Sequence, residues 1–111
     1  MKFEDKVAQL RIKKHKGMET EVFLHDVVTM TQGEALEYLL GEVFFCDAKV
    51  DLSYRPMIPR PETEFWVKQA LDEIEGGENK FVIRALDLFS GSGNVGLAIL
   101  KRFDNAIVDM I

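Results

Sequence analysis

The segment from Leu86 to Leu100, LDLFSGSGNVGLAIL, has the spacing with the clearest chemical meaning in this chain. Its glycines at positions 91, 93 and 96 match a G-x-G-x-x-G turn. Glycine has no Cβ and readily adopts positive φ, so such a turn lets a ligand approach the backbone closely. A helix that follows the turn offers free N–H donors and the positive end of its dipole. The segment is therefore a candidate binding turn between a strand and a helix.

Asp87 stands four residues before Gly91 and helps to decide which ligand the turn holds. A carboxylate this close to a pyrophosphate would repel it. S-adenosylmethionine (AdoMet) instead has an ammonium and a sulfonium group, which a carboxylate at the C-terminal end of a strand attracts. Phe89 would add an apolar wall. These residues favour AdoMet, while a dinucleotide binder and a purely structural glycine turn stay open as alternatives.

The elements around the turn are predicted from the spacing of apolar residues. Phe81 to Leu88 is a nearly continuous apolar run, which is typical of a strand buried on both faces of a parallel sheet. Helical spacing follows the turn, at Gly96, Ile99, Leu100 and Phe103. Residues 106–111 are predicted to form a second strand. The order is strand, loop, helix, strand, which indicates an α/β fold.

Short helices and a hairpin are predicted upstream. Apolar spacing indicates one helix around Val7, Leu10 and Lys14, and a second around Val22, Phe23, Val27 and Met30. The sequence Thr31-Gln32-Gly33-Glu34 has the form of a capping box and predicts a third helix, ended by Gly41. Two β-prone runs, 43–45 and 48–52, flank Cys46-Asp47 and predict a hairpin.

The stretch SYRPMIPRPETEFW contains three prolines, which fix φ and predict an extended segment that leads into a helix. Pro61 suits the first turn of that helix, and Gly76-Gly77 suits its end. A buried stripe is predicted at the spacing i, i+3, i+4, i+7, with the residues Val67, Ala70, Leu71 and Ile74. We expect Phe65 and Trp66 to pack in the core.

Composition excludes several classes of protein. The chain has 111 residues, 47% of them hydrophobic and 30% charged, as expected for one small globular domain or a domain plus a fragment. Its net charge of -5 argues against a general nucleic-acid binder, although contact of the basic N-terminal stretch with RNA is a minority alternative. No apolar run approaches the length of a membrane span. One cysteine and no leader-like start predict a cytoplasmic protein. His15 and His25 lack neighbouring ligands, so we expect surface residues and no metal.

The string IPRPETEFWV, Ile58 to Val67, followed by LDLFSGSGNVGLAIL, resembles the HemK family. Members of that family methylate the glutamine of the Gly-Gly-Gln loop in peptide chain release factors. The segment GEALEYLLG, Gly33 to Gly41, is similar to the end of the family's small N-terminal helical domain. The resemblance implies a helical substrate-recognition domain at 1–41, a β-hairpin linker at 42–58 and a methyltransferase domain that starts at 59–111. That domain would hold the first β-α-β unit of an incomplete Rossmann-like class I AdoMet-dependent fold.

The resemblance also implies which residues form the site. The AdoMet pocket would be lined by Asp87, Phe89, Ser90, Gly91, Ser92 and Gly93. The wall where the linker meets the catalytic domain would be formed by Arg60, Pro61, Glu62 and Thr63. On the residues alone, this second string can also be a rigid turn with a helix cap. Phe89 and Ser90 replace the first two residues of the family's usual Gly-Thr-Gly-Ser-Gly turn.

Two parts of the family's site do not occur in these 111 residues. One is the Asn-Pro-Pro-Tyr motif that holds the substrate amide, and the other is the acid that binds the AdoMet ribose, expected one position after Ile111. Asp109 is the one carboxylate on the second predicted strand, and we expect it to be exposed at the edge, with substitution for the missing acid as the alternative. The resemblance therefore predicts no catalytic residue within the chain and a release factor as the protein substrate. From the resemblance together with the composition, we expect neither membrane nor direct nucleic-acid binding.

A sheet of two parallel strands with few helices leaves apolar faces uncovered. We therefore expect the 111-residue chain by itself to be marginally stable, prone to aggregate and inactive. Two alternatives come from other classes. One is a fragment of an NAD-type dinucleotide-binding oxidoreductase, and the other is a non-catalytic module that binds release factors.

Overall fold

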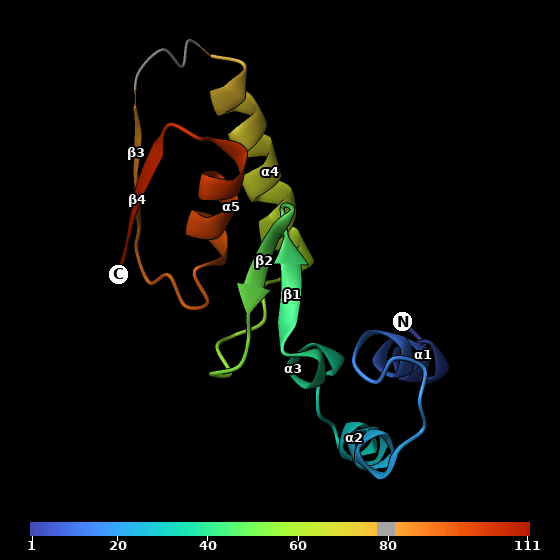
Figure 1. Cartoon of the computed structure of the whole chain (residues 1–111). Helices are drawn as coiled ribbons and strands as arrows, with labels where there is room; N and C mark the ends of the chain where they lie inside the picture. The colour runs from blue at the N-terminus through green and yellow to red at the C-terminus, as the bar shows by residue number, and fades with distance from the viewer. Residues whose placement is uncertain (78–81) are drawn as a thin grey trace. The chain divides into compact units, whose positions relative to one another are not determined.

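The computed structural model shows an α/β protein and describes residues 1–77 and 82–111. The chain divides into two compact units, Met1–Glu42 and Val43–Ile111. The first unit contains helices, and the second contains a hairpin, two helices and a parallel strand pair (Figure 1).

Three helices form the first unit: α1 (Phe3–Lys13), α2 (Glu21–Thr31) and α3 (Leu36–Leu40). Both helices predicted for the first thirty residues are thus confirmed. Thr20 caps α2, because its hydroxyl oxygen accepts a hydrogen bond from the Phe23 N–H at 3.3 Å. The shared core consists of Leu10, Phe23, Met30 and Leu36.

The capping box predicted at Thr31 is wrong. Thr31 is the last residue of α2, and its hydroxyl donates to the carbonyl of Val28 one turn earlier. The N-cap of α3 is Ala35, which makes no side-chain capping bond. A threonine hydroxyl can bond to a carbonyl of its own helix as well as cap the next one, and the sequence pattern does not distinguish the two. The predicted end of α3 is confirmed, since Gly41 has a φ of 80°.

His15 is largely buried, so its expected surface position is wrong. Its side chain is 8% exposed, and Nε2 lies 2.7 Å from Asp26 Oδ2. An ionised carboxylate only accepts, so the His15 Nε2–H donates. Lys14 Nζ lies 2.8 Å from the same oxygen. Burial raises the pKa of Asp26, but the hydrogen bonds and charges of Lys14 and His15 together outweigh it and hold the pKa below its ordinary value. His25 is exposed, as predicted.

The predicted hairpin is present in β1 (Glu42–Phe45) and β2 (Ala48–Asp51). Its two turn residues, Cys46 and Asp47, have φ of 46° and 66°, as a two-residue hairpin turn of the primed type requires. One face of the hairpin is buried, because Phe45 and Val50 are 2% and 0% exposed.

The helix α4 (Pro61–Glu75) begins and ends where the sequence predicts. Its buried face is narrower than predicted, because Leu71 is 2% exposed while Ile74 is 37% exposed. The expected core packing of Phe65 and Trp66 is wrong, since these side chains are 58% and 69% exposed. Neither residue shares a helical face with Leu71, and their rings contact each other edge to face with centroids 5.9 Å apart.

The predicted strand, loop, helix and strand are β3 (Ile83–Asp87), the glycine turn, α5 (Asn94–Arg102) and β4 (Ala106–Met110). The two strands are parallel, with Ile83 opposite Ala106. Helix α5 packs on β3 and β4 and also contacts β2 of the hairpin (Figure 1).

One face of the parallel pair is covered and the other is open. Along β3 half-buried and exposed residues alternate, and Leu86 on the open face is 58% exposed. Ile107 on β4 is 48% exposed. The predicted burial of this strand on both faces is therefore wrong, because among the described residues only α5 covers the pair closely. Phe81, the predicted start of the strand, lies outside the described residues.

Candidate functional site

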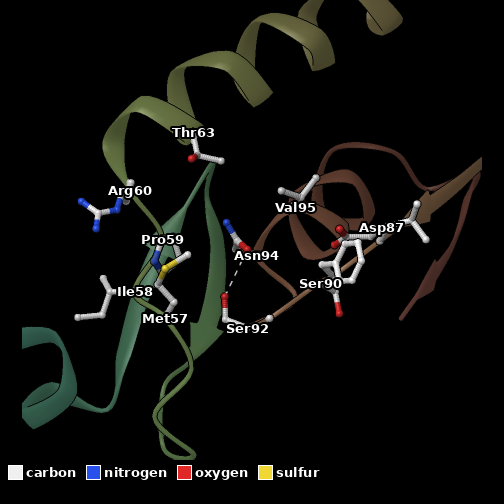
Figure 2. A pocket seen from close by; sticks show the side chains of 13 residues that line it. Met57, Ile58, Pro59, Arg60, Thr63, Asp87, Ser90, Ser92, Asn94 and Val95 are labelled. Carbon is white, nitrogen blue, oxygen red and sulfur yellow. Dashed lines mark hydrogen bonds between the residues drawn. The ribbon is translucent and has the colours of Figure 1, made fainter.

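A cavity of about 270 Å³ lies in the second unit between the proline-rich segment and the glycine turn (Figure 2). Two stretches that are distant in sequence form its walls. The first stretch contributes Met57, Ile58, Pro59, Arg60 and Thr63. The second runs from the end of β3 into α5 and contributes Asp87, Leu88, Phe89, Ser90, Gly91, Ser92, Asn94 and Val95. The fold thus brings together the two strings that the sequence analysis singled out.

Seven of the ten predicted site residues line this cavity: Asp87, Phe89, Ser90, Gly91, Ser92, Arg60 and Thr63. The other three do not. Pro61 is the first residue of α4, Glu62 is exposed on its first turn, and Gly93 is buried as the N-cap of α5. The sequence analysis missed the apolar lining of Met57, Ile58, Pro59, Leu88 and Val95 and the amide of Asn94. A signal was available, since these residues flank the predicted ones directly.

Glycine is present at different positions of this segment for different structural reasons. Gly91 faces the cavity with a φ of 56°, and an added Cβ would meet no atom within 4 Å, so the space beside its backbone is open to a ligand. Gly96 is a packing residue. A Cβ there would lie 2.5 Å from Met110 Cε and 3.1 Å from Val108 Cγ1, so a side chain at this position would require both neighbours to move.

Asp87 is the last residue of β3 and has a structural role in addition to any role in ligand binding. Its Oδ2 accepts a hydrogen bond from the N–H of Gly96 at 3.1 Å, within the first turn of α5. Gly93 is the N-cap of that helix and has no side chain to do this, so Asp87 takes over the capping. The bond also fixes the carboxylate at the cavity wall, where it supplies a negative charge.

The loop between β3 and α5 is held mainly by backbone hydrogen bonds. The Ser90 N–H donates to the carbonyl of Ile111 at 2.9 Å, and the Gly93 N–H donates to the carbonyl of Ser90 at 2.8 Å. Ser92 Oγ donates to Asn94 Oδ1 at 3.3 Å, the dashed line in Figure 2. Phe89 has a φ of 55° and is 96% exposed.

Glu64, the last residue of the PRPETE string, ties the hairpin to α4. Its Oε2 accepts a hydrogen bond from the backbone N–H of Cys46 at the hairpin tip, at 2.8 Å. Burial, with a smaller effect of the Glu64 charge, raises the pKa of the Cys46 thiol. The string therefore fits both interpretations of the sequence: Pro61 and Glu64 organise the backbone, while Arg60 and Thr63 are among the residues that line the cavity.

The cavity has one acidic and one basic residue on different walls. Asp87 is the last residue of β3, and Arg60 is the residue just before α4 (Figure 2). The remaining lining is largely apolar or small. Such a site suits a ligand with both charges and an apolar part. Asp109, mid-strand on β4, is exposed as expected and does not line the cavity.

Within residues 1–77 and 82–111, no cluster of three or more His, Cys, Asp or Glu side chains is arranged to hold a metal ion. In the same part of the chain, no helix is long and apolar enough to cross a membrane.

Sequence comparison identifies relatives over this same region. A release factor glutamine methyltransferase of Thermodesulfovibrio yellowstonii is 43% identical over 69 residues, which is 62% of this chain and 24% of the relative. The one of Lactococcus lactis is 31% identical over 103 residues, 91% of this chain and 37% of the relative. A probable mitochondrial N(5)-glutamine methyltransferase of Schizosaccharomyces pombe is 35% identical over 67 residues, 60% of this chain and 22% of the relative. No family model matches.

By their names, these relatives belong to the class of methyltransferases that modify glutamine in proteins. Over most of its length the chain is similar to the release factor glutamine methyltransferases of the HemK family, as the resemblance predicted. It spans about a quarter to a third of the length of the curated relatives it matches.

Proposed function

We propose that the cavity binds AdoMet and that the chain forms the cofactor-binding part of an enzyme that methylates the glutamine side-chain amide of release factors. The observation that supports this most is the cavity itself, which gathers Asp87, the open Gly91 turn and Arg60 in one place. The names of the relatives support both the reaction and the substrate. Release factors act in translation, which fits the expected cytoplasmic location.

Each wall has a role in this proposal. Asp87 attracts the positive ammonium and sulfonium groups, and Arg60 complements the AdoMet carboxylate. The Gly91 turn lets the methionine part approach the backbone, and the apolar residues around it exclude water. When bound, AdoMet supplies an already activated methyl group, so the protein's task is alignment.

The surrounding fold has a corresponding interpretation. We propose that β3, α5 and β4 are the first β-α-β unit of a Rossmann-like class I methyltransferase fold. The unit Met1–Glu42 contains the proposed substrate-recognition helices. The 111 residues contain no Asn-Pro-Pro-Tyr sequence to hold the amide, so we propose that they do not methylate by themselves.

The competing ligand is a dinucleotide, and one titration separates the two. The ¹⁵N-labelled chain is titrated with AdoMet and, separately, with NAD⁺, and the amide resonances of Gly91, Ser92 and Val95 are followed by NMR. This measurement detects weak binding. We expect AdoMet to shift these amides at lower concentration than NAD⁺, because a pyrophosphate meets the Asp87 carboxylate. Preference for NAD⁺ would overturn the proposal.

A further inference from the structure

Phe89 has a backbone conformation that its own packing does not explain. Its φ of 55° lies in the left-handed region, where the Cβ of an L-residue crowds the following carbonyl. For a bulky side chain such a conformation is a clear outlier. Folding gains little from the ring, since the residue is 96% exposed. Strained residues of this kind concentrate at ligand sites, where the strained conformation is part of the function.

The position of Phe89 indicates that function. It lines the cavity two residues after Asp87 and two before Gly91. One short stretch of the cavity wall therefore contains both an aromatic residue and a carboxylate. Both attract a cation, the carboxylate by its charge and the ring by the negative potential of its face. The neighbours Ser90 and Ser92 offer no such surface.

We infer that Phe89 is a specificity-determining residue that recognises the positive sulfonium of the methyl donor through its ring face. The inference rests on the proposed function. It means that the site distinguishes AdoMet from S-adenosylhomocysteine, which has a neutral thioether at the same position.

Binding of the two ligands tests this directly. The labelled 111-residue chain and its variants are titrated with AdoMet and with S-adenosylhomocysteine, and the dissociation constants are taken from the amide shifts. Phe89→Leu keeps the apolar bulk and removes the ring. It should weaken AdoMet binding about threefold to thirtyfold and change S-adenosylhomocysteine binding less than about twofold. Phe89→Tyr keeps the ring and should restore AdoMet binding.

Phe65→Leu is the matched control, because Phe65 is also exposed but does not line the cavity. It should leave both constants unchanged. Equal weakening of both ligands by Phe89→Leu would overturn the inference, because the ring would then be a general apolar cover. No effect on either ligand would also overturn it and leave the proposed function intact. Failure of the unmodified chain to bind either ligand would overturn the proposed function and the inference together.

Discussion

Gly96 packs so closely on β4 that one added methyl group tests the contact between α5 and the strand. In Gly96→Ala the new Cβ would lie 2.5 Å from Met110 Cε, and 3.1 Å from both Met110 Sδ and Val108 Cγ1. Carbon atoms in good contact are about 3.5 to 4.0 Å apart, so the neighbours must move. Met110 is flexible and 38% exposed, whereas Val108 is stiff at χ1.

The magnitude follows from two opposing effects. Overpacking of this kind lowers the free energy of unfolding by about 1 to 3 kcal/mol. Alanine in place of glycine stabilises a helix by about 1 kcal/mol. We therefore expect Gly96→Ala to destabilise the second unit by about 1 kcal/mol. In a Met110→Ala background two of the three close contacts are gone, and the same substitution should be neutral or slightly stabilising.

A double-mutant cycle measures this coupling. Urea unfolding, followed by circular dichroism, is compared for the unmodified chain, Gly96→Ala, Met110→Ala and the double variant. We expect an interaction energy of about 1 to 2 kcal/mol between the two sites. Additive effects, or a stabilising Gly96→Ala in the unmodified background, would refute the assigned packing role of Gly96.

Three further predictions concern charge, the hairpin and the open sheet face. The pKa of Asp26 is held below its ordinary value of 3.8, so its carboxylate stabilises the fold above that pH and the stabilisation is lost as pH falls below it; thermal melts of Asp26→Asn should show a flatter fall in Tm on acidification. Glu64→Ala removes the acceptor of the Cys46 N–H and should lower the free energy of unfolding by about 1 to 2 kcal/mol, while an unchanged urea midpoint would contradict that role. Leu86→Thr with Ile107→Thr should reduce light scattering of the concentrated chain, with a change in stability below about 0.5 kcal/mol; unchanged scattering would show that this face does not drive association.

The sequence predicted the element order because its signals are local. The Cys46-Asp47 turn, Pro61 at a helix start and the glycines after β3 each act through backbone conformation, and each lies where the sequence placed it. The capping box at Thr31 failed although its pattern was right, because the same hydroxyl also bonds within the preceding helix.

Contacts between distant residues could not be predicted in the same way. His15 is largely buried and pairs with Asp26 of α2, and no spacing rule gives that pair. The capping of α5 by Asp87 and the bond from Cys46 to Glu64 also require the folded chain. The cavity residues were predicted more completely, because the resemblance to the HemK family pointed to both strings that form the cavity.

The central claim is that the negative charge of Asp87 selects a cationic methyl donor over a diphosphate. The most direct measurement is the ratio of the AdoMet and NAD⁺ dissociation constants for the unmodified chain and for Asp87→Asn, which keeps an oxygen to cap α5. We predict that the unmodified chain prefers AdoMet and that the substitution weakens AdoMet about tenfold without weakening NAD⁺. An unchanged ratio, or a preference of the unmodified chain for NAD⁺, would contradict the claim.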